Sequence, residues 1–174
     1  RITNLLATLQ RLHCLTQRGE QISDPTQLTF NAEVKLHHAS LLPESYCPNV
    51  HERLLLYKKL AQAVDKTALD SVLEELIDRF GLLPPASKLL LDSHYLRLRA
   101  NSLGIFLIDA AEERIKLVFA KHTSVKPEQL IALIQKQPKD FRLKDGNQLI
   151  FKISEPDPFK RVILVDNLLD ALNF

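Results

Sequence analysis

Apolar residues recur along the chain at two spacings, and each spacing predicts a different kind of element. Helical spacing is found in residues 4–18, 51–64, 67–80, 84–103, 127–137 and 157–172. Alternation, or a short apolar run beside a turn, predicts strands at 30–37, 105–109, 114–120, 141–144 and 149–153. This order predicts an α+β fold: a single domain of about six helices with a small, mostly antiparallel sheet built from an early strand and two hairpins.

Capping and turn residues predict where several of these elements begin and end. Thr67, with Asp70 three residues later, is expected to form a capping box that starts the helix at 67–80. Gly81 is expected to take the left-handed conformation after that helix, and Gly104 is expected to end the next one. Asp157, which a proline follows, predicts the start of the last helix.

Composition and charge narrow the class of protein. Of the 174 residues, 45% are apolar and 25% are charged, as in soluble globular proteins. The formal net charge is +2, so composition gives no argument for a nucleic-acid partner, which normally needs a clustered basic face. The chain contains no methionine, and we interpret it as a fragment of a longer protein. Its two cysteines, and a start without an export signal, favour a reducing cytoplasm.

Residues able to bind a metal or attack a substrate are few and poorly spaced for either task. His37 and His38 are neighbours in a predicted strand, so they would point to opposite faces and could not chelate one ion together. Cys47 and His51 have a spacing that occurs in zinc sites, but a zinc site needs four ligands. Cys14 lies within a predicted helix and is interpreted as an apolar core residue. We therefore expect no catalytic residue, metal ligand or cofactor in this chain.

Charged residues are clustered in two ways. Basic residues form three short pairs in predicted helices, Lys58-Lys59, Arg97/Arg99 and Lys160-Arg161. We interpret these pairs as solvated helix faces, and weak contact with DNA stays open. The segment 65–79 holds five acidic and two basic residues, and Glu74 and Asp78 share a helix face within it. This segment is either a solvated acidic face or a docking surface for an arginine-bearing partner.

Several separated motifs are similar to one bacterial family. They are Leu41-Leu42-Pro43-Glu44-Ser45-Tyr46, Pro48-Asn49-Val50, Tyr57-Lys58-Lys59, the run from Glu75 to Pro84, Leu103-Gly104-Ile105 and the run from Leu130 to Pro138. On these motifs the chain resembles the C-terminal domain (TRCF domain) of bacterial transcription-repair coupling factors (Mfd). The resemblance spans nearly the whole chain, more loosely over residues 1–35. Asn49 stands where the family usually has an aspartate, a departure that concerns a local helix cap.

The resemblance implies regulation without chemistry in this domain. The family's full-length proteins are ATP-driven translocases on double-stranded DNA that displace stalled RNA polymerase and recruit UvrA, with ATP and Mg²⁺ bound by motor domains upstream. This last domain is implied to dock on an N-terminal UvrB-like module, to mask its UvrA-binding surface, and to restrain the motor until RNA polymerase is engaged. Residues 1–38 would lead from the motor, and residues 39–174 would form the regulatory body. The implied location is the bacterial cytoplasm near the nucleoid, with no membrane partner.

The resemblance also places the docking contact on the acidic helix. Glu75 and Asp78 would pair with arginines of the UvrB-like module, Arg79 would add a contact of opposite sign, and Glu74 is a further candidate. Phe80 is expected to fix the helix to its own core. The alternative function is a nucleic-acid-contacting accessory domain that guides the translocase on DNA.

Overall fold

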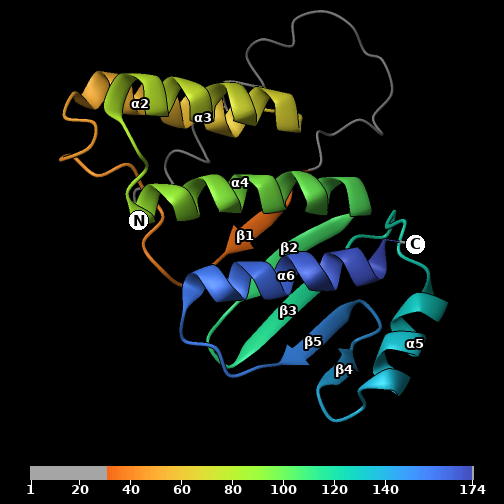
Figure 1. Cartoon of the computed structure of the whole chain (residues 1–174). Coiled ribbons are helices and arrows are strands. Elements are labelled where there is room, and N and C mark those ends of the chain that lie inside the picture. The colour runs from red at the N-terminus through yellow and green to blue at the C-terminus, as the bar shows by residue number, and fades with distance from the viewer. Residues whose placement is uncertain (1–30, 174) are drawn as a thin grey trace, which may run out of the picture. The chain divides into compact units, whose positions relative to one another are not determined.

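Five strands pair into one mixed sheet in the computed structural model, which describes residues 31–173 (Figure 1). The strands are β1 (Glu33–Lys35), β2 (Ile105–Ala110), β3 (Arg114–Phe119), β4 (Phe141–Lys144) and β5 (Gln148–Lys152), in the order β1-β2-β3-β5-β4. β1 runs parallel to β2, and the other three pairings are antiparallel. The sheet is therefore mostly antiparallel, as predicted, although β1 is shorter than the alternating segment at 30–37. The division of the chain between residues 38 and 39 stays a prediction.

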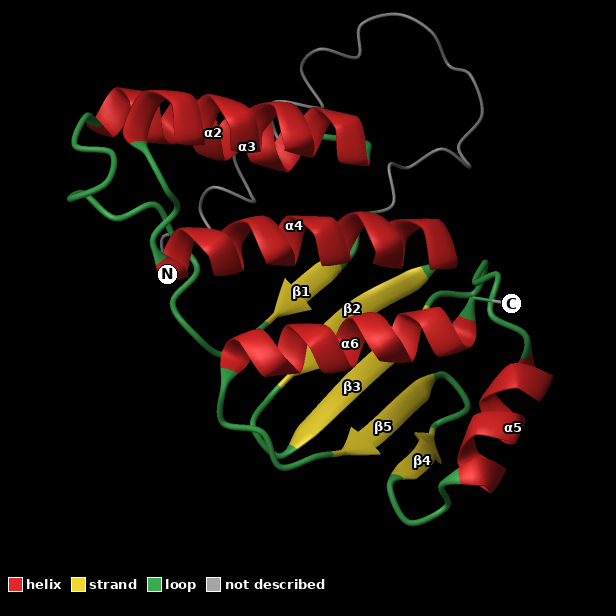
Figure 2. Cartoon of the chain, viewed as in Figure 1, coloured by secondary structure: helices red, strands yellow, loops and turns green. Residues whose placement is uncertain are grey.

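Five helices accompany the sheet within residues 31–173 (Figure 2). They are α2 (Val50–Gln62), α3 (Lys66–Phe80), α4 (Pro85–Leu103), α5 (Pro127–Lys136) and α6 (Pro158–Leu172). α4 and α6 cross one face of the sheet, α5 lies beside β4, and α2 and α3 pack on the side of α4 that is turned away from the sheet. The predicted α+β single domain is confirmed, and the helix predicted at 4–18 lies outside the described residues. None of the five helices is both long enough and apolar enough to cross a membrane.

Two clusters of buried side chains lie on opposite sides of α4. The sheet cluster includes Ile108 and Leu117, which are fully buried between the sheet and its covering helices. The helical cluster includes Leu76 and joins α2, α3 and α4. α4 contributes Leu89 to the sheet cluster and Leu91 to the helical cluster, so this one helix connects the two halves of the described structure.

Several helix ends differ from the prediction. The capping box at Thr67 is wrong, because α3 begins earlier: the Asp65 carboxylate accepts a hydrogen bond from the backbone N–H of Ala68 at 2.8 Å. Aspartate is at least as good a cap as threonine, and the earlier start lengthens the hydrogen-bonded helix. Gly81 has the expected positive φ of 88°, but its ψ of −165° lies outside the left-handed helical region. Gly104 is left-handed, as predicted, with φ 70° and ψ 37°.

Two arginines expected on solvated helix faces are buried. Arg97 is 9% exposed and donates hydrogen bonds to the carbonyl oxygens of Leu60 (3.0 Å) and Ala63 (3.1 Å), where α2 ends. Arg161 is 4% exposed and donates to the carbonyl oxygen of Ala110 at 3.3 Å. The prediction of solvated faces was wrong for both, because a guanidinium can be buried where it donates hydrogen bonds to backbone carbonyls.

Candidate docking surface

α3 carries the predicted docking residues, and contacts at its carboxyl end fix its position. The buried stripe of α3, which includes Leu76, packs into the helical cluster. The Tyr46 hydroxyl lies 3.1 Å from the carbonyl oxygen of Leu76 and 2.7 Å from that of Gly81. Phe80 packs against this tyrosine with ring centroids 5.6 Å apart and joins the same cluster, as predicted. The end of α3 is therefore held to the loop before α2.

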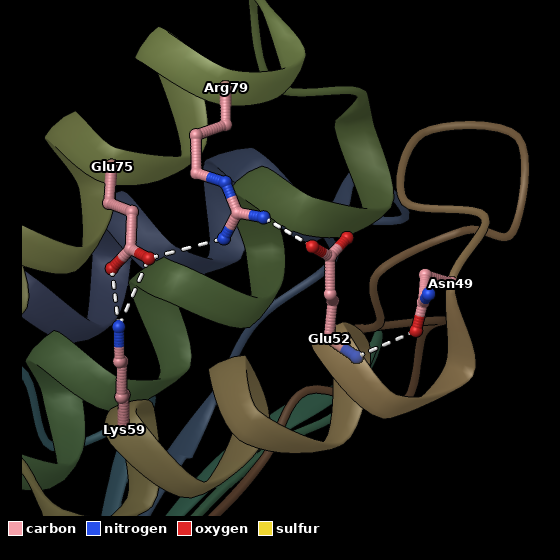
Figure 3. Close-up of polar contacts among 5 residues, drawn as sticks. All are labelled: Asn49, Glu52, Lys59, Glu75 and Arg79. Carbon is pink, nitrogen blue, oxygen red and sulfur yellow. Dashed lines mark hydrogen bonds and ion pairs between the residues drawn. The ribbon is translucent and has the colours of Figure 1, made fainter.

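A chain of charged groups joins α3 to α2 along one edge (Figure 3). Lys59 of α2 donates to both carboxylate oxygens of Glu75, at 3.0 and 2.8 Å. Arg79 bonds to the same Glu75 at 3.3 Å and reaches Glu52 of α2 at 2.6 Å. Asn49 caps α2 by accepting from the backbone N–H of Glu52 at 3.1 Å. Asn49 thus serves as the N-terminal cap of α2.

The environment of Glu75 favours its ionised form. The hydrogen bond from Lys59 lowers the pKa of the Glu75 carboxyl, and Arg79 adds to the effect, while partial burial opposes it. The Glu75 side chain is 29% exposed and that of Lys59 is 52% exposed, so water screens the pair. Such ion pairs each contribute about 1 kcal/mol or less to stability. They can therefore orient α3 on α2, but they contribute little to the stability of the fold.

Glu74 and Asp78 occupy a different part of the α3 surface. Both residues are exposed, and neither forms an ion pair or side-chain hydrogen bond with another residue in the described part of the chain. They are four residues apart and share a helix face. Ile77, which is 39% exposed, lies beside them on the helix. This combination provides two unpaired carboxylates and an accessible apolar side chain.

The four predicted docking residues therefore divide into two groups. Glu75 and Arg79 are occupied by partners on α2, whereas Glu74 and Asp78 are available to a partner outside the described chain. Sequence reasoning did not identify Lys59 and Glu52 as the partners of the first group. The i,i+4 spacing of Glu75 and Arg79 predicts their mutual ion pair, but no sequence pattern shows which residues of α2 lie opposite them.

Other candidate groups have local structural roles. Cys47 is fully buried in the helical cluster, and burial, followed by the charge of Glu52, raises the pKa of its thiol. His37 lies after β1 with a φ of 53° and bonds through Nε2 to Asp109 at 2.5 Å. No group of three or more His, Cys, Asp or Glu residues within 31–173 is placed to hold a metal ion. Cys14 lies outside the described residues.

Comparison with protein families gives a match over more than half of the chain. The family model described as "TRCF domain" matches residues 36–130, which include all of α2, α3 and α4. The helix α3, which carries the predicted docking residues, and its neighbour α2 therefore both lie within the matched region.

Individual relatives agree with the family match. The chain is 43% identical over 119 residues to the "Transcription-repair-coupling factor" of Escherichia coli (strain K12), a match that covers 68% of this chain and 10% of that protein. It is 33% identical over 158 residues to the protein of the same name from Buchnera aphidicola subsp. Acyrthosiphon pisum, covering 91% of this chain and 20% of the relative. The chain thus spans about a tenth to a fifth of the length of these relatives.

One solved structure shows the same fold. The crystal structure of the C-terminal domain of a transcription-repair coupling factor superposes with a TM-score of 0.65. The superposition covers 82% of this chain and 94% of the other, at 22% sequence identity. At this identity the likeness concerns the arrangement of helices and strands, and it does not transfer the roles of single residues.

Proposed function

This chain belongs to the TRCF domain family, the C-terminal domain of transcription-repair coupling factors, and from that membership we propose that it is a non-catalytic regulatory domain. The domain docks through α3 on the N-terminal UvrB-like module of its own full-length protein. Docking masks the UvrA-binding surface of that module. It also restrains the ATP-driven DNA translocase until RNA polymerase is engaged.

The observation that carries this proposal is the pair of unpaired acidic side chains on α3. Glu74 and Asp78 have no counter-ion among the described residues and flank the exposed Ile77. Arginines of a partner would provide the missing charges in bidentate geometry, and the apolar side chain would be covered at the same time. Of the residues suggested by the resemblance, Asp78 and Glu74 become the main contacts.

Glu75 and Arg79 have a supporting role in this proposal. Because their side chains already bond to Lys59 and Glu52, they fix the rotation of α3 relative to α2. A partner arginine could share the Glu75 carboxylate, since a carboxylate accepts more than two hydrogen bonds. We therefore expect a smaller effect on docking from Glu75 than from Asp78.

Exposed charged residues such as those on α3 suit a docking contact that must be reversible. Exposed charge pairs contribute about 1 kcal/mol or less each, so the contact is weak between separate molecules. Within one chain, tethering raises the effective concentration to roughly the millimolar range for short linkers. Engagement of RNA polymerase would then favour the open form, provided that the polymerase binds this form more tightly.

Calorimetric titration of this chain with the separately expressed UvrB-like module of the same protein tests the proposal. We expect wild-type binding that Glu74→Lys/Asp78→Lys abolishes and that Glu75→Gln weakens only a few-fold. Glu112→Lys/Glu113→Lys is the matched control: it makes the same change of charge at exposed positions between β2 and β3. Equal losses in the docking and control variants would show that α3 is not the contact.

A full-length protein provides the second measurement. If α3 makes the docking contact, Glu74→Lys/Asp78→Lys in the full-length chain increases its affinity for UvrA, because the masking domain is released. A variant that binds UvrA no better than the wild type would remove this assignment, even if the separate domains bind weakly in the calorimeter.

A further inference from the structure

The sheet has a second face that the helices α4 and α6 do not cover. Strand register identifies its members, because residues directly opposite one another in paired strands point to the same side. One row across the sheet consists of Glu33, Leu107, Val118, Gln148 and Lys144, and the next row consists of Lys35, Asp109, Lys116, Ile150 and Arg142. A third, shorter row pairs Arg114 with Lys152. We call these twelve residues the outer sheet face.

The outer sheet face is strongly basic although the chain is nearly neutral. It carries six basic residues and two acidic residues, a net charge of +4, whereas the whole chain has a net charge of +2. The rest of the chain must therefore have a net charge of −2. The six basic residues come from four strands, one from β1 and the others from β3, β4 and β5, and pairing of the strands brings them together.

Most of these basic side chains have no counter-ion. Five of them, Arg114, Lys116, Arg142, Lys144 and Lys152, form no ion pair with another described residue. Both acidic residues on the face are engaged, Glu33 with Lys35 at 3.8 Å and Asp109 with His37 at 2.5 Å. The face therefore presents positive charge that nothing in the described structure neutralises.

The outer sheet face is accessible to a partner. Figures 1 and 2 show α4 and α6 in front of the sheet, with no described helix behind it. The basic residues are exposed except Lys116, which is half-buried together with the central Leu107, Val118 and Ile150. In contrast, the residues on the opposite side of β3, Ile115 and Leu117, are fully buried under the helices.

The composition of this face selects the kind of partner. Protein interfaces are enriched in aromatic residues and depleted in lysine, whereas the outer sheet face has four lysines beside one exposed phenylalanine, Phe106, at the register irregularity of β2. Single-stranded nucleic acids are bound mainly by stacking of successive bases on several aromatic side chains, and a single phenylalanine does not provide such a row. Several unpaired Lys and Arg residues on one face are typical of proteins that contact duplex phosphates without reading the bases.

We propose that the outer sheet face binds the phosphate backbone of double-stranded DNA, through Arg114, Lys116, Arg142, Lys144 and Lys152. Binding is electrostatic and independent of base sequence, because the contacts are to phosphates. The site is separate from α3, so it neither requires the docking proposal nor fails with it.

Fluorescence anisotropy of a labelled duplex of random sequence, titrated with this 174-residue chain at several salt concentrations, tests the proposal. About five phosphate contacts predict a drop in affinity of more than about 100-fold between 50 and 200 mM salt. Lys144→Gln/Lys152→Gln should weaken binding about tenfold or more at 50 mM salt and reduce the slope of log K against log salt by about 2.

The matched control is Lys58→Gln/Lys160→Gln, which removes two exposed lysines from α2 and α6 and leaves the same net charge. We expect this control to keep at least half of the wild-type affinity and nearly the wild-type salt slope. Three results would overturn the proposal: no duplex binding at 50 mM salt, equal losses in both variants, or binding of polyglutamate in place of duplex. The last result would assign the face to an acidic protein.

Discussion

The acidic edge of α3 and the outer sheet face are both charged surfaces, but they are built in opposite ways. The acidic edge places Glu74, Glu75, Asp78 and Arg79 within six consecutive residues of one helix, and half of these side chains are occupied by α2. The outer sheet face collects its charge from five strands, and most of its basic side chains are unpaired.

This difference separates charges that orient an element from charges that have no counter-ion among the described residues. On α3, the ion pairs with Lys59 and Glu52 orient the helix, so only part of its charge is left without a counter-ion among the described residues. On the sheet, hydrogen bonds between strands and the buried opposite side already fix the geometry. The basic side chains are not needed for that purpose, and five of the six have no counter-ion among the described residues.

The largest expected effect concerns the core under the acidic edge. Leu76→Ala removes a fully buried side chain from the helical cluster, and it should lower the free energy of unfolding by about 2–5 kcal/mol. Urea denaturation measures the change. Leu82→Ala, at a position 86% exposed, is the matched control and should stay within about 0.5 kcal/mol of the wild type. Similar losses in the two variants would contradict the assigned position of α3.

A pH-dependent effect on stability comes next. It concerns α4, the helix that packs on the sheet and on α3. In α4, burial and then the charge of Arg97 lower the pKa of His94 from 6.5 to about 4. The unfolded chain therefore binds this proton more readily between pH 6.5 and pH 4, and stability falls as the pH falls through this window. The loss due to His94 is up to about 3 kcal/mol.

Urea denaturation of the wild type and of His94→Gln at pH 7 and pH 4.5 measures this contribution. The variant should lose less stability than the wild type on acidification, because it has no imidazole to protonate. Carboxylates such as Glu75 titrate in both proteins, so their contribution cancels in the comparison. Identical losses in the two proteins would show that His94 is not held neutral by the fold.

A smaller effect distinguishes the two groups of residues on α3. Glu75→Gln breaks the ion pairs with Lys59 and Arg79 and should reduce stability by about 1 kcal/mol at low salt. Glu74→Gln removes a carboxylate that repels Asp78 and should leave stability unchanged or slightly increased. Thermal denaturation at low and high salt measures both, and the cost of Glu75→Gln should shrink as salt screens the pairs. Equal costs would contradict the division of the docking residues.

The smallest effect is expected on the outer sheet face. Lys144→Gln/Lys152→Gln should shift the melting temperature by less than about 2 °C, because neither side chain has a partner among the described residues. The measurement is a thermal melt in the buffer used for the DNA titration. A large decrease would mean that these lysines support the fold, and the loss of DNA binding could then not be assigned to the face.

Local signals account for most of the fold that could be predicted. The helical spacing before Phe80, the proline at the start of α4 and the Asp157 cap of α6 each depend on neighbouring residues, and the structure confirms them. The cap at Thr67 was wrong because Asp65, two residues earlier, competed for the same role. Burial of Arg97 was also missed, since its backbone partners on α2 are distant in sequence.

The sequence by itself determined the elements, the family and the acidic character of α3, because each depends on residues close together along the chain. Only the tertiary structure decided which acidic residues are occupied, since Lys59 and Glu52 come from another helix. The outer sheet face also exists only in the tertiary structure, because strand register brings Lys35 and Lys152 to the same side of one sheet. The net charge of +2 does not reveal this basic face, because adding up the charges of a sequence does not show which of them become neighbours in the fold.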